Sequence, residues 1–466
     1  FLSRRDTHCH FMLQHQRMRG SRLSKQSNRD KFRSGCYNTT SKPCPNHSVT
    51  AGVPMSHKVF CVIAILFAQA ATNAHAGDWP QILGPDRNGI AKGEKLLAKW
   101  PANGPAEVWS RAVGQGFAGV AIQDGTLLLF HRLEDFEIVE AIDAATAEAM
   151  WTQRFECDYE SGMSSDSGPR CVPLIADGQV YVFGAKGDLR CLDLKTGKPV
   201  WSRDTRGDFS APEGYFGAGS SPVLFQDRLI VNVGGRDKAG VVAFSTKDGS
   251  TLWQNVEDNA SYSSPIVVNV GGNPHAIVVT RLNTVSLNPA DGTIRFQFPF
   301  GMRGPTVNGA TPVVIDDHLF VSASYRVGSV WAKMKASSVD VTASEEKLLA
   351  TQYATPIHHN GVLFAADGRQ DMGSATLKCI DPAAEKVLWE QGGFDYGTLV
   401  KVNDELLFLT TEGELIRFAA DVKAYSEKQR CNVLNATPRG YRLPAISNGR
   451  LYVRDDKTLK CLQIGE

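Results

Sequence analysis

The sequence predicts an all-β protein: an eight-bladed β-propeller of four-stranded antiparallel blades, closed by an N-terminal strand. Three observations indicate this fold. A turn followed by an apolar strand recurs eight times, an aromatic residue recurs at a fixed distance after a polar turn, and a proline precedes most repeats. With 42% hydrophobic residues and 43 glycines, the 466-residue chain has enough apolar residues for a large core and enough turn residues for many short strands.

The repeat of turn and strand sets the number of blades. Its eight members follow one another at intervals of 53, 49, 47, 43, 44, 43 and 45 residues. They are DGTLLLF from Asp124, DGQVYVF from Asp177, QDRLIVN from Gln226, NPHAIVV from Asn273, DDHLFVS from Asp316, NGVLFAA from Asn360, NDELLFL from Asn403 and NGRLYVR from Asn448. A period of about 40 to 50 residues with several short strands is the length of one propeller blade.

A second repeat places an aromatic residue eight positions after a polar residue that enters a turn. The five pairs are Asp143 and Trp151, Asp193 and Trp201, Ser245 and Trp253, Asn288 and Phe296, and Asp381 and Trp389. In a segment such as DLKTGKPVW, the glycine supplies a positive φ for the turn and the tryptophan has a large apolar face to bury. We therefore expect these aromatic residues, together with Trp109, to dock each blade on its neighbour.

Proline marks the start of the inner strand in most units. The segments are PRCVP around Cys171, GSSP ending at Pro222, YSSP ending at Pro265, ATP ending at Pro312 and at Pro356, and RLP ending at Pro444. The first residue of a strand tolerates proline because no hydrogen bond of the ladder is lost there. Each blade is thus expected to run from a proline-opened inner strand to an outer strand that carries the aromatic residue.

The chain ends are expected to meet in the last blade. After Asn448 there is room for only two further short strands, whereas AEVWSRAV around Trp109 has the pattern of an outer strand that lacks a blade. Pairing this segment with the last blade would remove an exposed sheet edge. The propeller then spans residues 105–466, and residues 77–104 form an N-terminal arm that we expect on its outside.

Residues 55–76 have the pattern of a secretory signal peptide. Lys58 precedes an apolar run from Val59 to Ala68, and small residues flank His75 before the expected cleavage after Ala76. The run is far shorter than the roughly 20 residues that span a bilayer. The sequence therefore predicts a protein of the periplasm or a secreted protein, with no membrane span after cleavage.

Residues 1–54 are basic and show no hydrophobic periodicity. We interpret them as a misassigned or disordered extension before a natural start at Met55. The alternative is a basic cytoplasmic tail on an uncleaved anchor.

The charge of the chain is divided unevenly. Residues 1–76 carry 11 Lys and Arg against 2 Asp and Glu, so residues 77–466 hold 39 basic and 47 acidic residues, a net charge of −8. Such an acidic body is a poor candidate for binding nucleic acid or an anionic membrane surface. We expect no nucleic-acid partner, and we expect the protein to be a monomer.

The cysteines fall into two groups. Cys191, Cys379 and Cys461 occur in LRCLDL, LKCIDP and LKCLQI, which predicts the same buried strand position in three repeats. Cys157 and Cys171 flank a polar loop and are the candidates for a disulfide in an exported chain. Because no CxxC motif or Cys/His cluster is present, the sequence predicts no metal site.

Two segments resemble a known family. CLDLKTGKPVW, from Cys191 to Trp201, and the opening DWPQILGPDRNG, from Asp78 to Gly89, are similar to bacterial exported pyrroloquinoline-quinone-like (quinoprotein-like) propeller repeat proteins. The resemblance covers residues 78–466 and implies the propeller fold. It says less about activity, because the shared residues are those that dock blades. The fifth and seventh units depart from the pattern at SVWAKMKASSVDV and FAADVKAYS.

The function that we favour is an exported, non-catalytic scaffold that binds a protein partner or extended ligand through one loop-rich face. In this interpretation the chain resembles the propeller lipoprotein of the outer-membrane β-barrel assembly machinery. The longest insertions, Asp158–Arg170 and Asp204–Ser221, both precede proline-opened inner strands, so both should reach one face near the axis. The candidate binding residues are Tyr159, Asp166, Arg170, Phe209, Tyr215 and Phe216. Solvated loops without a ligand are the alternative for any one of them.

The alternative function is a quinone-dependent dehydrogenase of alcohols or sugars. For such an enzyme the resemblance implies pyrroloquinoline quinone at the axis, calcium held by carboxylate and amide oxygens, an Asp base and, in alcohol-oxidising members, an adjacent cysteine pair. The chain has no adjacent cysteines, and we find no match between its acidic residues and the family's calcium and base positions. The sequence therefore assigns no catalytic residue, and we expect no cofactor.

Overall fold

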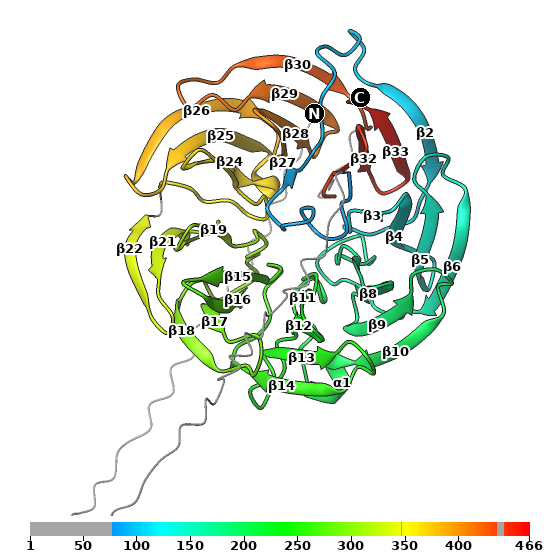
Figure 1. Cartoon of the computed structure of the whole chain (residues 1–466), viewed down its shortest axis with the longest axis vertical. Helices are drawn as coiled ribbons and strands as arrows, with labels where there is room; N and C mark the ends of the chain where they lie inside the picture. The colour runs from blue at the N-terminus through cyan, green and yellow to red at the C-terminus, as the bar shows by residue number, and fades with distance from the viewer. Residues whose placement is uncertain (1–76, 346, 436–441) are drawn as a thin grey trace, which may run out of the picture. The chain divides into compact units, whose positions relative to one another are not determined.

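The computed structural model describes residues 77–345, 347–435 and 442–466. Within these ranges the strands form eight sheets arranged in a ring, which confirms the predicted eight-bladed propeller (Figure 1). The expected extension at 1–54 and the expected signal peptide at 55–76 lie outside the described residues. Among the described residues, no helix combines the length and the apolar character needed to cross a membrane.

The first four blades follow the chain in order, and each runs from an inner to an outer strand. Blade 1 contains β3 (Ala121–Gln123), β4 (Thr126–Leu133), β5 (Phe136–Asp143) and β6 (Ala149–Glu156). Blade 2 contains β7 (Leu174–Ala176), β8 (Gln179–Phe183), β9 (Asp188–Asp193) and β10 (Pro199–Asp204). Blade 3 contains β11 (Val223–Phe225), β12 (Arg228–Asn232), β13 (Val241–Ser245) and β14 (Thr251–Asn255). Blade 4 contains β15 (Ile266–Val270), β16 (Asn273–Val279), β17 (Asn283–Leu287) and β18 (Ile294–Pro299).

The last four blades complete the ring. Blade 5 contains β19 (Val313–Ile315), β20 (His318–Ala323), β21 (Gly328–Met334) and β22 (Val339–Glu345). Blade 6 contains β23 (Ile357–His359), β24 (Val362–Arg369), β25 (Ser374–Asp381) and β26 (Lys386–Phe394). Blade 7 contains β27 (Gly397–Val402), β28 (Glu405–Thr410), β29 (Glu414–Ala419) and β30 (Glu427–Asn432). Blade 8 contains β31 (Ala445–Ser447), β32 (Arg450–Arg454), β33 (Thr458–Gln463) and the N-terminal β2 (Ala106–Ala112). The helical elements of the described ranges are α1 (Thr205–Phe209) and the 3-10 helix η1 (Gln370–Met372).

The ring closes as the sequence predicts. Strand β2 pairs antiparallel with β33 and places Trp109 opposite Cys461. Proline also stands directly before six of the eight inner strands, as Pro222 does before β11 and Pro444 before β31. The N-terminal strand therefore covers an outer edge that would otherwise be free to pair with another chain.

The repeated turns owe their tightness to left-handed backbone conformations. Asp124 and Asn448 have φ values of 47° and 52°, and each is followed by a glycine with positive φ. Two-residue hairpin turns need this geometry, which Asp, Asn and Gly adopt readily. In blade 4 the turn lies at Gly271 and Gly272, so the repeat segment beginning at Asn273 starts within β16, after the turn.

The aromatic repeat joins neighbouring blades. Each indole N–H donates to a carbonyl oxygen between the third and fourth strands of the next blade, at 2.8–3.1 Å. The pairs are Trp109 with Ala144, Trp151 with Leu194, Trp201 with Thr246, Trp253 with Pro289, and Trp389 with Asp421. Phe296, which has no N–H, packs in the apolar cluster between blades 4 and 5.

Three cysteines share one position beside these aromatic residues. Cys191, Cys379 and Cys461 lie on the third strand of their blades and are fully buried, as predicted. The expected disulfide, by contrast, is not formed, because Cys157 and Cys171 are both free thiols. Cys171 packs in the core of blades 2 and 3, where it acts as a small apolar side chain, and burial raises its pKa to about 12.

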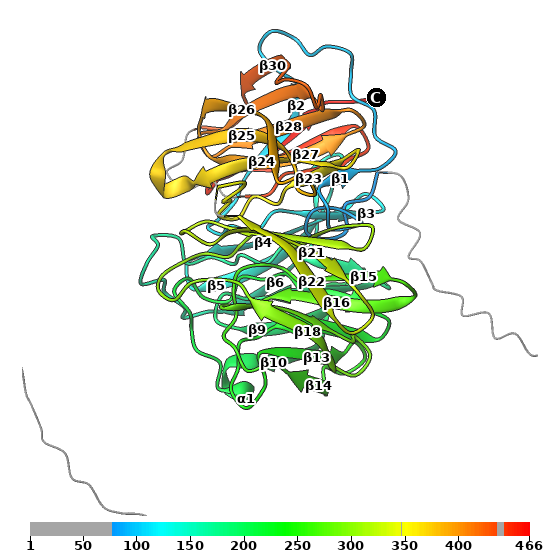
Figure 2. The same cartoon turned by 90° about the vertical axis from the view of Figure 1, so that its left-hand side faces the viewer.

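The expectation that the N-terminal arm lies outside the propeller is wrong for residues 77–91, whereas the segment that follows reaches the outer strand β30, where Trp100 and Gln429 exchange hydrogen bonds. Residues 77–91 lie at the centre of the ring (Figure 1), and the 90° view again places β1 (Ile90–Ala91) beside β27 (Figure 2). Trp79 bridges to Ile122 of β3, and β1 pairs parallel with β27. The guanidinium of Arg87 donates to the carbonyl oxygens of Ser221 and Pro222 at 2.9 and 2.8 Å. Inner strands leave an unpaired edge toward the axis, and the arm supplies partners for that edge.

Candidate functional site

The strand connections give the propeller two different faces. One face bears the turns between the first and second and between the third and fourth strands, and we name it the turn face. The other, which we name the loop face, bears the turns between the second and third strands and the loops that lead to the next blade. Both long insertions, 158–170 and 204–221, belong to the loop face, as expected.

On the loop face, Asp166 holds together segments from distant parts of the chain. Its Oδ2 accepts hydrogen bonds from the backbone N–H of Gly116 at 3.0 Å and from Nη2 of Arg442 at 3.1 Å. Its Oδ1 accepts one from the N–H of Gly168 at 2.9 Å. Both carboxylate oxygens are therefore engaged in internal hydrogen bonds, which favours a structural role for this side chain.

Arginines gather around this carboxylate. Arg170 donates to the carbonyl of Gly168 at 2.7 Å, and its guanidinium lies over the rings of Phe117 and Tyr159. Arg454 donates to backbone carbonyls, and burial, with the neighbouring positive charge of Arg442, lowers its pKa to about 9. These arginines form a buried, positively charged framework beneath the loops, and the framework holds the loops in place.

The six candidate binding residues differ in burial and in location. Tyr159 and Asp166 are buried, and Arg170 is half-buried in the same framework. These three residues therefore shape the loop and present little surface to a partner. The sequence could not show this, because the arginine that covers Asp166 lies 276 positions away.

The other three candidates lie in and after α1. Phe209 packs at the end of α1 against Phe244, with ring centroids 5.9 Å apart. Phe216 is half-buried, its ring 5.7 Å from that of Tyr262. Tyr215 is 42% exposed and is the residue of this group that faces solvent most openly.

A pocket of about 330 Å³ opens between blades 2, 3 and 4, and we name it the Tyr215 pocket. Its lining includes Tyr215, Tyr262, Lys186, Arg206, Asn232 and Arg281. Asn232 and Arg281 were not predicted, because they end a strand and lie in a short turn outside the long insertions. Burial raises the pKa of Tyr262, whose hydroxyl accepts a hydrogen bond from the N–H of Phe216.

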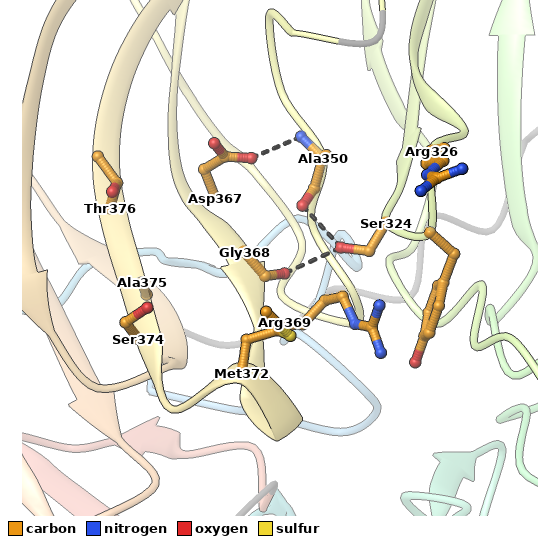
Figure 3. Close-up of a pocket in the computed structure, with 11 residues that line it drawn as sticks. Ser324, Arg326, Ala350, Asp367, Gly368, Arg369, Met372, Ser374, Ala375 and Thr376 are labelled. Carbon is orange, nitrogen blue, oxygen red and sulfur yellow. Dashed lines mark hydrogen bonds between the residues drawn. The ribbon is translucent and has the colours of Figure 1, made fainter.

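A second pocket, of about 390 Å³, lies between blades 5 and 6 (Figure 3). The hydroxyl of Ser324 lies 2.7 and 2.9 Å from the carbonyl oxygens of Ala350 and Gly368. The guanidinium of Arg369 lies 4.0 Å from the ring centroid of Tyr325. These contacts fix the walls of the pocket, which Met372 also lines.

Exposed apolar side chains are a further feature of the loop face. We name them the apolar rim: Leu133, Met163, Tyr215, Met302 and Met372. In the described turns of the turn face, Val422 is the large apolar side chain with comparable exposure. Methionine adapts its shape to different apolar partners. Glycine beside methionine in the polar segments SGMSS, FGMRG and DMGS was a signal that sequence reasoning missed.

The side chains present do not fit a calcium and quinone site. Calcium takes six to eight oxygen ligands, mainly carboxylates and amides. Within the described ranges, no three acidic, histidine or cysteine side chains are grouped so that they could hold a metal ion. Asp166, which lies in the long loop before blade 2, already accepts three hydrogen bonds.

Comparison with known proteins gives one family and two kinds of fold neighbour. The family model described as "Outer membrane protein assembly factor BamB" matches residues 135–391. The protein of that name from Escherichia coli is 26% identical over 261 residues, which cover 52% of this chain and 63% of that protein. The match thus spans less than two thirds of this relative.

Solved structures show the same fold at low identity. BamB from Moraxella catarrhalis has a TM-score of 0.56 at 14% identity, covering 77% of this chain and 97% of that one. Quinohemoprotein alcohol dehydrogenase from Comamonas testosteroni has a TM-score of 0.59 at 13% identity, covering 85% and 82%. At this identity the likeness establishes the fold alone.

Proposed function

Since the chain belongs to the outer membrane protein assembly factor BamB family, we propose that it is an exported, monomeric scaffold that binds a protein through its loop face. The partner that we propose is a protein of outer-membrane assembly, held along an extended segment. Export would follow cleavage after Ala76, so N-terminal sequencing of the mature protein is expected to read Gly77, Asp78 and Trp79.

The observation that carries this proposal is the apolar rim. Five large apolar side chains are exposed on the same face as the two pockets, Met163, Met302 and Met372 among them. Exposed methionines offer a protein partner apolar contact area that can adapt its shape. The arm segment around Glu94 is hydrogen-bonded to the turns at Asn403 and Asn448 on the turn face, whereas both pockets lie on the loop face.

The test replaces the three rim methionines together. The variant Met163→Ser, Met302→Ser and Met372→Ser should lower co-purification of outer-membrane assembly proteins from the native envelope by about tenfold, because it removes apolar contact area. Quantitative mass spectrometry of the captured proteins measures the effect.

A matched control removes as many exposed apolar residues from the outer strands. Met150→Ser, Val200→Ser and Leu252→Ser lie on β6, β10 and β14, away from the loop face. This variant should capture partners as the wild type does. Equal losses in the two triple variants, or no loss in the first, would contradict the proposal.

The second candidate function is the quinone-dependent dehydrogenase. A sequence match to quinohemoprotein alcohol dehydrogenase from Comamonas testosteroni, 29% identical over 124 residues, favours it. The acidic, histidine and cysteine side chains of the described residues argue against a calcium site. Turnover with added quinone and calcium separates the two functions.

A further inference from the structure

The Tyr215 pocket contains a buried positive charge that lacks an acidic partner among the described residues. Arg281 is 9% exposed, and its Nη1 donates to the carbonyl oxygen of Thr306. Its Nη2 is buried and has no hydrogen-bond partner in the described structure. A buried charge without a counter-charge is costly, so this position favours an anion.

The other cations of the pocket differ from Arg281 in this respect. Lys186 pairs with Asp158 at 2.6 Å, and Arg206 pairs with Glu213 at 2.5 Å. Glu213 is the one acidic residue among the lining residues, against three basic ones. The pocket therefore has an excess of positive charge, and Arg281 is where that excess is buried.

The same pocket also contains an unused acceptor. Asn232 is 1% exposed, and its Nδ2 donates to the carbonyl oxygen of Val279 at 3.1 Å. Its Oδ1 is buried and has no partner in the described structure. A ligand that satisfies both groups brings an anion for Arg281 and a hydrogen-bond donor, such as a peptide N–H, for Asn232.

The backbone holds Arg281 in place before any ligand arrives. Its N–H donates to the carbonyl oxygen of Asn259 at 2.9 Å, and its own carbonyl oxygen accepts from Nδ2 of Asn308 at 3.3 Å. The ring of Tyr215 lies 5.3 Å from the Arg281 guanidinium carbon and is partly exposed. The backbone hydrogen bonds thus fix the position of Arg281, and the partly exposed ring of Tyr215 covers its guanidinium.

We propose that the Tyr215 pocket binds an acidic residue of an extended peptide, with its carboxylate on Arg281 and a peptide N–H on Asn232. This inference rests on the proposed function, since it names the chemistry of the bound segment. A volume of about 330 Å³ is small for a cofactor and suits one or two side chains.

The test measures the binding of three heptapeptides, which differ in the central residue or in the blocking of the chain ends, to the purified protein. One peptide has a central Asp and both ends blocked, and a second has Asn in its place. A third has the central Asn and a free C-terminal carboxylate, which separates a side-chain source of the anion from a chain end. We expect the Asp peptide to bind about tenfold more tightly than the blocked Asn peptide in calorimetry, with the third no tighter than the second.

Two variants locate the effect. Arg281→Gln should reduce the preference for Asp to less than about twofold, because the charge-assisted bond is lost. Arg206→Gln removes a charge from the same pocket but leaves Arg281, so most of the preference should remain. Equal binding of the Asp and Asn peptides to the wild type overturns the inference, and this comparison needs no variant to fold.

The outcomes also separate this inference from the proposed function. If partner capture depends on the rim methionines but the peptides bind equally, the acidic-residue site alone is wrong. If the Asp peptide binds selectively but capture is insensitive to the methionines, the scaffold function of the rim is wrong and the pocket stands.

Discussion

Oδ2 of Asp166 lies 3.1 Å from Nη2 of Arg442, although the two residues are 276 positions apart in the chain. This pair joins the loop before blade 2 to the segment that enters blade 8. Both side chains are almost fully buried, so the interaction is shielded from water. The relationship explains why a polar loop keeps a fixed shape on the candidate binding face.

Breaking this pair should destabilise the protein. Asp166→Asn leaves buried arginines without their carboxylate, for which we expect a loss of about 3 kcal/mol in the free energy of unfolding. Urea unfolding monitored by tryptophan fluorescence measures it. Asp158→Asn in the same loop is the control, because its ion pair with Lys186 is exposed and should contribute little. Similar effects of the two substitutions would show that the Asp166 pair contributes no more to the free energy of unfolding than an exposed ion pair does.

Trp201 should contribute strongly to the docking of blade 2 on blade 3. Trp201→Ala removes a buried ring and its hydrogen bond to Thr246, and we expect destabilisation of about 3 to 5 kcal/mol. The neighbouring Val200 is 45% exposed, so Val200→Ala provides a control with a small effect. An unchanged melting curve for Trp201→Ala would remove the docking role.

The arm should stabilise the propeller through Arg87. Arg87→Met leaves the carbonyl oxygens of Ser221 and Pro222 without their donor, and we expect a cost of about 2 to 4 kcal/mol. Lys92→Met, which removes an exposed ion pair with Asp86 in the same arm, should change stability by less than about 0.5 kcal/mol. Calorimetric melting of both variants tests this, and equal melting temperatures would refute the role of Arg87.

Acid should destabilise the protein partly through His275. Burial lowers the pKa of His275 from 6.5 to about 4, so the folded state favours the neutral ring. The stabilising contribution is complete above pH 6.5 and is lost as the pH falls from 6.5 toward about 4. His275→Gln keeps a polar partner for Ser286 and should lose less stability than the wild type between pH 7 and pH 4.5. Parallel stability curves for the two proteins would exclude this contribution.

Added pyrroloquinoline quinone and calcium should produce neither dye-linked oxidation of alcohols or sugars nor a large thermal shift. A tightly bound cofactor would stabilise the fold by about 2.7 kcal/mol at a hundredfold excess over its dissociation constant. Steady quinone-dependent turnover would instead support the dehydrogenase function and reject the non-catalytic scaffold.

The repeating parts of the fold could be predicted from the sequence because they depend on local chemistry. Asp124 and Asn448 occupy left-handed turn positions, Pro222 stands before an inner strand, and Trp109 pairs the chain ends, as the repeats indicate. Turn geometry and strand periodicity are encoded within a few residues of each other. This holds even for ring closure, because one outer strand is left over at one end of the chain and one is missing at the other.

The position of the N-terminal arm and the choice of residues that form the candidate site depend on the tertiary structure. Arg87 finds carbonyl oxygens more than 130 residues away, and no local pattern indicates that these carbonyls face the axis. Asp166 and Tyr159 look like surface loop residues in sequence, yet distant segments bury them. Arg281 and Asn232 belong to different blades, and only the packing of those blades brings them to one pocket. Burial and charge pairing depend on which segments meet in space, whereas turns and strands depend on neighbours in the chain.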